Sequence, residues 1–200
     1  MKESYITTDF RKTVAEKFPQ RAKEMNTAFD KRLEELRKEN TGVSKELNFH
    51  LERQILAGIA AYEVLQSEMP KDEALKIIHG YVEDHALDAR GKIESLLHIP
   101  GLYRVVPALF SKMARKMFGK SAGFDAVEHQ TSGGVWRIDM TKCPYNDFCT
   151  KYGHSELCTC FCDSDDVTYG NMHPKLLWHR TKTLGRGGDC CDFCIKLSDK

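Results

Sequence analysis

Cysteine is the residue type in this chain with the most chemistry to offer, and all eight cysteines lie near one end. They stand at positions 143, 149, 158, 160, 162, 190, 191 and 194, and the first 142 residues contain none. In a reducing compartment, such clustering indicates metal binding or thiol chemistry before disulfides. The alternative is simple burial, because free cysteine packs as a small hydrophobe, and we expect that of about half of them.

Thiol catalysis needs a thiolate, a group that lowers its pKa or takes its proton, and a polar handle for the substrate. The same segment supplies all three. Aspartate can act as base or orienting group, and the forked donors of arginine suit a carboxylate, although the arginines could also form a solvated strand edge. The candidate nucleophiles are Cys143, Cys162 and Cys191, the candidate acids or bases are Asp165 and Asp192, and the candidate carboxylate binders are Arg180 and Arg186.

The cysteine spacing is a weaker indication of a metal site. Cys158, Cys160 and Cys162 would share one face of a strand, whereas a helix would spread them, so only a strand or loop makes them a ligand cluster. Cys191 and Cys194 form a Cys-x-x-Cys, but in a strand they point to opposite faces, and a zinc knuckle needs a turn there. Thiol catalysis requires no cofactor, yet zinc or iron stays open, with Cys160, Cys190, Cys194 and His154 as candidate ligands.

Helical periodicity dominates the chain before Gly119. Residues 11–39 lack glycine, and Pro19 predicts a break between two helices. A stripe of apolar residues predicts a helix that begins after a cap at Ser44 and ends near residue 69. Asp72 is expected to cap a helix over residues 73–97, and a further amphipathic helix is expected over residues 106–118. These four or five helices form a predicted scaffold over residues 1–119.

After Gly123 the pattern alternates, as in strands. Residues 124–130 and 135–142 flank a turn at 131–134 and predict a hairpin whose second strand delivers Cys143 at its end. Residues 176–184 and 189–197 predict a second strand pair around a glycine-rich turn. In the last strand, alternation separates Cys191 from Cys190 and Cys194.

The predicted fold class is therefore α+β, with an N-terminal helical part followed by a C-terminal antiparallel β-sheet that holds the cysteine-rich site. We expect residues 120–200, the catalytic part, to pack with the helices as one domain.

Charge and hydropathy limit the classes of partner that we expect this protein to bind. With 30 basic and 29 acidic residues the chain lacks the positive surface that nucleic-acid binding requires. The N-terminus is charged where a signal peptide is apolar, and no run approaches the ~20 apolar residues that span a bilayer. We expect a cytoplasmic protein with a small-molecule carboxylate as its partner and neither nucleic acid nor membrane; homo-oligomerisation is left open.

Taken together, the C-terminal motifs form an ordered pattern over about residues 134–195. It runs through Cys143-Pro144-Tyr145, Glu156-Leu157-Cys158, Phe161-Cys162, Asp165-Asp166, Arg180-Thr181-Lys182-Thr183-Leu184 and Gly187-Gly188-Asp189-Cys190-Cys191-Asp192-Phe193. This pattern resembles the L-2-amino-thiazoline-4-carboxylic acid hydrolase family. Cys149, Cys160 and Cys194 are extra relative to it.

The resemblance implies hydrolytic opening of a cyclic isothiourea to N-carbamoyl-cysteine. It implies a catalytic set of Cys143, Cys158, Cys162, Asp165, Cys191 and Asp192, and a substrate-binding set of Arg180, Thr183 and Arg186. Two other classes stay open: a zinc or iron-sulfur protein with a structural, redox-sensing or metal-sensing role, and a binding module without chemistry.

Overall fold

The computed structural model describes residues 3–131 and 133–198. Helices form where the apolar spacing predicts them: α1 (Tyr5–Lys17) and α2 (Ala22–Glu39) are separated at Pro19, as expected. Ser44 caps α3 (Lys45–His50), because its Oγ accepts a hydrogen bond from the Leu47 N–H at 3.0 Å. The chain continues through a π-helical turn, η1 (Leu51–Ile55), into α4 (Leu56–Gln66), so the long helix predicted after Ser44 is confirmed with one irregular turn inside it.

The helix α5 (Lys71–Leu97) begins earlier than predicted. Its N-cap is Pro70 rather than Asp72, so the predicted cap was wrong. Asp72 lies instead in the first turn, where a carboxylate still interacts favourably with the helix dipole. A short helical turn, η2 (Leu102–Val105), leads into α6 (Val106–Met117), which is amphipathic as predicted.

Four strands form one antiparallel sheet, in the order β1-β2-β4-β3. The predicted first hairpin is confirmed by the pairing of β1 (Asp125–Glu128) with β2 (Val135–Lys142), and Ser132 of its turn lies outside the described residues. The second pair is β3 (Leu176–His179) and β4 (Cys191–Leu197).

β3 ends five residues earlier than the sequence pattern predicts. The N–H groups of Thr181 and Lys182 both donate to the Asp192 carboxylate at 2.8 Å, so they are not available to a strand. The segment then forms a short 3₁₀ turn, η5 (Leu184–Arg186), which brings the chain back to β4. This side-chain contact replaces the ladder that would have extended the strand.

Two helices in the C-terminal part were not predicted. After β2 the chain forms α7 (Pro144–Lys151), a short turn η4 (Ser155–Leu157) and α8 (Cys158–Tyr169). The strand or loop needed for a Cys158, Cys160 and Cys162 ligand cluster is therefore wrong. On the helix, Cys158 and Cys162 share one face at a spacing of four, and Cys160 points elsewhere.

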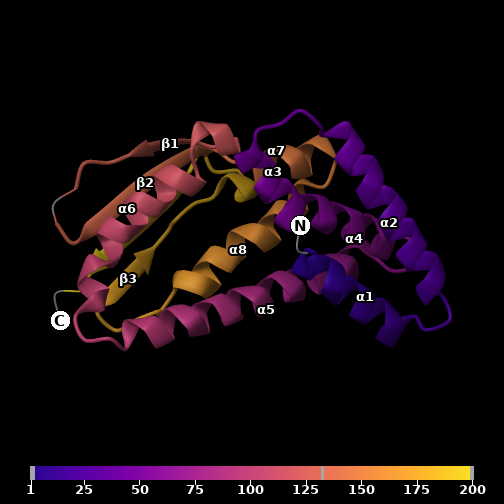
Figure 1. Cartoon of the computed structure of the whole chain (residues 1–200), viewed down its shortest axis with the longest axis horizontal. Helices are drawn as coiled ribbons and strands as arrows, with labels where there is room; N and C mark the ends of the chain where they lie inside the picture. Colours follow the sequence, from indigo (N-terminus) through magenta and orange to yellow (C-terminus); the bar gives the residue numbers. More distant parts are fainter. Residues whose placement is uncertain (1–2, 132, 199–200) are drawn as a thin grey trace.

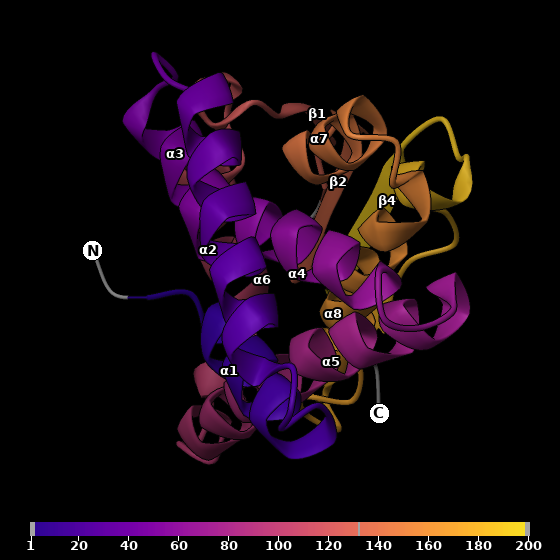
Figure 2. The ribbon, with the colours of Figure 1, turned by 90° about the vertical axis from the view of Figure 1, so that its right-hand side faces the viewer.

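The helix α8 connects the two parts of the molecule. Figure 1 shows α1, α2 and α4 at one end, the sheet at the other, and α5 and α8 running between them. Figure 2, turned by 90°, again places α8 beside α5, and these two helices pack along each other. The main hydrophobic core combines α8 with the N-terminal helices and includes Phe10, Phe29, Tyr62, Ile78 and Phe161. A second cluster lies between α6 and the sheet, around Trp136, Ile138 and Ile195.

The contact between α4 and α8 gives a test of this packing. A Cβ added at Gly58 would lie 2.9 Å from Cζ of Phe161, whereas a Cβ at Gly80 of α5 would meet no atom within 4 Å. Both substitutions by alanine gain helix propensity, but only one overpacks the core. We expect Gly80→Ala to raise the free energy of unfolding by about 0.5–1 kcal/mol and Gly58→Ala to lower it by about 1–2 kcal/mol in urea titrations. An equal gain in both variants would contradict the packing described.

Candidate active site

A cavity of about 290 Å³ lies between the helices and the sheet. Its walls come from η1, α5, α6, α8 and three strands, and they are mostly apolar, with Phe110, Met113, Trp136, Trp178 and Phe193 among them. A concave apolar site with few polar groups is the usual form of a small-molecule site, for which volumes of roughly 300–1,000 Å³ are typical. The cavity is therefore at the small end of that range.

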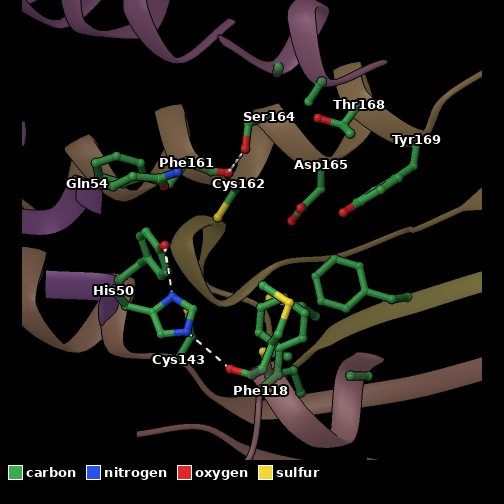
Figure 3. Close-up of a pocket in the computed structure, with 18 of the residues that line it drawn as sticks. His50, Gln54, Phe118, Cys143, Phe161, Cys162, Ser164, Asp165, Thr168 and Tyr169 are labelled. Carbon is green, nitrogen blue, oxygen red and sulfur yellow. Dashed lines mark hydrogen bonds between the residues drawn. The ribbon is translucent and has the colours of Figure 1, made fainter. Parts of the chain in front are cut away.

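One face of α8 supplies most of the polar groups of the cavity. Cys162, Asp165 and Tyr169 follow one another at spacings of three and four, so they lie along the same face. Figure 3 shows these three side chains directed into the cavity, with His50 on the opposite wall. The helix that the sequence pattern did not predict is thus the element that places the candidate reactive groups.

Cys162 is the cysteine whose surroundings favour the thiolate. Its pKa is lowered to about 7, first by a hydrogen bond from the Cys158 thiol, whose sulfur lies 3.9 Å away, and further by Thr183, the Arg180 charge and the Gly185 N–H. These effects outweigh burial, which acts in the opposite direction. Because all eight cysteines lie in the described part of the chain, they can be compared directly, and for the other seven the thiol pKa is raised.

The backbone of the η5 turn lies against the Cys162 thiol. A Cβ at Gly185 would lie 2.9 Å from Sγ of Cys162 and 3.0 Å from Sγ of Cys158, so only glycine allows the approach. The hydroxyl of Thr183 is buried beside the same sulfur and is otherwise without a partner. The turn and α8 together form a set of donors around Cys162.

Asp165, one turn along α8 from Cys162, tends to hold a proton. Burial raises its pKa to about 7, although the Arg180 guanidinium, with Nη1 3.6 Å from Oδ2, acts to lower it. The neighbouring Cys162 raises it further. A thiol and a carboxyl therefore lie one helical turn apart with pKa values near neutrality, an arrangement typical of catalytic sites.

Arg180 is buried between these groups, with its side chain only 4 % exposed. Its Nη1 donates to the Cys162 carbonyl at 3.0 Å, and its Nη2 forms an ion pair with Asp166. The same carboxylate accepts a hydrogen bond from the Trp178 indole at 2.7 Å. The guanidinium is thus engaged by groups of the protein itself.

Several of the predicted site residues meet here. The cavity is lined by Cys143, Cys162, Asp165, Arg180 and Cys191. Burial raises the pKa of Cys143 and that of Cys191, the latter to about 11, and the Cys191 sulfur accepts a hydrogen bond from the Leu184 N–H at 3.3 Å. These two thiols are therefore protonated neighbours of Cys162 at neutral pH. Cys158 and Thr183, which do not line the cavity, contact Cys162.

Other predicted residues lie elsewhere. Asp192 accepts the N–H groups of residues 181 and 182 on the opposite face of β4, and Arg186 forms an ion pair with Asp163 at 2.6 Å. The candidate metal ligands are dispersed: Cys160 is in the core, His154 bonds Glu63 at 3.1 Å, and Cys190 and Cys194 lie with Asp192. Within residues 3–131 and 133–198, no three His, Cys, Asp or Glu side chains are arranged to hold a metal ion.

His50 is a cavity residue that the sequence did not single out. Its Nε2 donates to the Met117 carbonyl at 3.1 Å, which leaves Nδ1 to accept from the Tyr145 hydroxyl at 3.2 Å. Burial lowers its pKa, so the ring is neutral in this tautomer. A histidine inside an apolar helical stripe is the one signal that could have identified it.

Comparison with known protein families identifies the family of this chain. The family model of L-2-amino-thiazoline-4-carboxylic acid hydrolase matches residues 48–195, about three quarters of the chain, and this range includes every residue that lines the cavity except Tyr5. The chain belongs to this hydrolase family. The predicted resemblance is therefore confirmed, and it extends further toward the N-terminus than the C-terminal motifs alone.

No curated protein matches the sequence. Solved structures give only loose likenesses. A trafficking protein particle complex subunit 3 from Naegleria fowleri, covalently bound to palmitic acid, is 17% identical over 72% of this chain and 94% of its own, with a TM-score of 0.37. H-NOX proteins from K. algicida and S. oneidensis are 12% and 11% identical, cover 100% and 99% of this chain and 98% and 100% of their own, and have TM-scores of 0.40 and 0.39. These scores are too low to assign a ligand. No described helix is long and apolar enough to cross a membrane.

The thiol environment predicts selective alkylation. Cys162 should react first with iodoacetamide, and its rate should rise through a pKa of about 7, because only the thiolate reacts. Peptide mass spectrometry across a pH series measures this rate. Cys158→Ala should shift the midpoint upward, since the thiol donor is removed, while Cys194→Ala should leave it unchanged. First modification of Cys143 or Cys191 would contradict the assignment.

Proposed function

We propose that this protein is a hydrolase that opens a small ring containing sulfur and nitrogen, of the 2-aminothiazoline-4-carboxylate type, with Cys162 as nucleophile and Asp165 as proton donor. The observation that carries the proposal is the pair itself: a thiol of lowered pKa and a carboxyl of raised pKa on one face of α8, both directed into a mostly apolar cavity. Membership of the hydrolase family supports the same reaction class.

In the first step the Cys162 thiolate adds to the ring carbon that is flanked by sulfur and nitrogen. The Asp165 proton passes to the ring nitrogen, which takes up the electron pair of the C=N bond. When the C=N bond re-forms, the carbon–sulfur bond of the ring breaks and the ring sulfur leaves as a thiolate. The substrate is then held on Cys162 through its amidine carbon.

In the second step Asp165, now a carboxylate, accepts a proton from water as the water oxygen adds to that carbon. The bond to Cys162 then breaks as the C=O bond forms, the hydroxyl proton passes to the product thiolate, the thiolate of Cys162 is regenerated, and the product is N-carbamoyl-cysteine. One water is consumed in the whole sequence. The Cys158 thiol, the Thr183 hydroxyl and the Gly185 N–H stabilise the Cys162 thiolate as the leaving group and so favour its release.

We place this reaction in the cytoplasm. All eight cysteines are free in the structure, and a reducing compartment keeps a reactive thiol such as Cys162 from oxidation.

Single substitutions test the nucleophile. Cys162→Ser should lower kcat for 2-aminothiazoline-4-carboxylate by roughly 10³-fold or more, since an alcohol lacks the acidity of this thiol. Cys194→Ser, on the other face of the sheet, is the matched control and should keep the wild-type rate. Turnover is followed by release of the product thiol, and mass spectrometry of the quenched reaction should find an adduct on Cys162. Normal turnover by Cys162→Ser would contradict the mechanism.

The pH profile tests the proton donor. Activity should rise as Cys162 loses its proton and fall as Asp165 loses its own; since both pKa values are about 7, the profile should be a narrow bell near neutrality. In Asp165→Asn the residual activity should keep only the rising limb, because no proton is left to lose. A bell-shaped profile that survives in Asp165→Asn would assign the falling limb to another group.

A further inference from the structure

Two arginines line the cavity, and they differ in what they already bind. Arg180 is buried and forms ion pairs with Asp165 and Asp166, as described above. Arg53, on the π-helical turn η1, has no ion pair with any carboxylate among residues 3–131 and 133–198. A substrate carboxylate at Arg180 would have to compete with two aspartates, whereas at Arg53 it would meet an uncompensated guanidinium.

The Arg53 guanidinium lies over the Phe49 ring, 5.7 Å from its centroid, and its one hydrogen-bond acceptor in the described part of the chain is a neutral histidine. Its Nη2 donates to Nε2 of His85 at 3.2 Å, so the remaining proton of that imidazole is on Nδ1. Burial and then the Arg53 charge lower the pKa of His85, which keeps the ring neutral. The His85 ring stacks on Tyr5 at 3.9 Å, and the Tyr5 hydroxyl is buried with no hydrogen-bond partner. All three residues line the cavity.

An unpartnered buried hydroxyl is costly to a folded protein, and its presence beside a guanidinium that has no ion pair favours an acceptor from outside the chain. A carboxylate fits best, because it can accept from the guanidinium fork and from a phenol at once. A cation would be repelled by Arg53, and a neutral apolar group would leave the Tyr5 hydroxyl unpaired.

The location is also suitable for a small ring acid. Arg53 precedes Gln54 on the π-helical turn, and such turns often occur at functional sites because they reorient side chains. Figure 3 shows Gln54 near Phe161, on the side of Cys162 opposite to Asp165 and Tyr169. In that view Cys162 lies between Gln54 of η1 and Tyr169 of α8, and Arg53 lines the same cavity as Cys162.

We propose that Arg53 and Tyr5, with His85 as the group that positions Arg53, form the subsite that binds the carboxylate of the substrate. This assignment rests on the proposed function for the identity of the ring but not for the existence of an anion site. It gives Arg180 a different role, which is to hold the charges of Cys162 and Asp165.

Binding to protein that cannot turn over tests the subsite directly. In a Cys162→Ser background, calorimetry compares 2-aminothiazoline-4-carboxylate with its 4-carboxamide, which has the same ring and lacks the carboxylate charge. The carboxylate should bind more tightly, and Arg53→Gln should weaken it roughly 10- to 100-fold while changing the carboxamide little. Tyr5→Phe should give a smaller loss of the same kind. Arg104→Gln removes a charge outside the cavity and is the control.

The outcomes separate the two proposals. If Arg53→Gln abolishes the preference for the carboxylate but the wild type does not open the ring, the subsite is retained and the proposed reaction is rejected. If the wild type opens the ring but Arg53→Gln leaves the affinity for the carboxylate unchanged, only the subsite is rejected. A parent that binds acid and amide equally, or a selective loss in Arg180→Gln instead, would also overturn the assignment.

Discussion

Arg180 is a buried guanidinium surrounded by three acidic groups, Cys162, Asp165 and Asp166. Its Nη2 pairs directly with Asp166, and its charge also acts to lower the pKa values of Cys162 and Asp165. Burial, together with the charges of Cys162 and Asp166, raises the pKa of Asp165 to about 7, although the single cation Arg180 acts to lower it. The pKa of Cys162 is lowered to about 7 because its thiolate accepts hydrogen bonds, first from the Cys158 thiol and then from Thr183 and the Gly185 N–H, and because the Arg180 charge acts in the same direction.

The fold supports this arrangement from both sides. The helix α8 is fixed in the main core through Phe161, which packs closely on Gly58 of α4, and its neighbour in sequence, Cys162, is thereby directed to the cavity. From the sheet side, Asp192 draws residues 181 and 182 out of β3 and allows the η5 turn to reach Cys162. Asp192 thus positions the site from a distance, and Gly185 permits the final contact.

The sequence predicted the helical scaffold, the four-stranded sheet and the family, because apolar period and ordered motifs are local signals. It did not predict α8. Cysteine, threonine and aspartate in residues 158–168 have modest helix propensity, and the helix is stabilised by burial of Cys158, Cys160 and Phe161 against distant helices. The local pattern also could not choose among the cysteines, since the low pKa of Cys162 depends on residues from 158 to 185. Arg53 and Tyr5 were missed because they join the cavity only through the packing of the N-terminal helices.

The measurement that tests the account most directly is the titration of the Asp165 carboxyl by NMR of its side-chain carbon, in wild type and in Cys162→Ser. The account predicts a wild-type pKa near 7, and a lower value in Cys162→Ser, because the neighbouring thiolate that raises it is gone. A wild-type pKa at the ordinary aspartate value, or one that the Cys162→Ser substitution leaves unmoved, would contradict the claim that these two groups share the charge of one arginine.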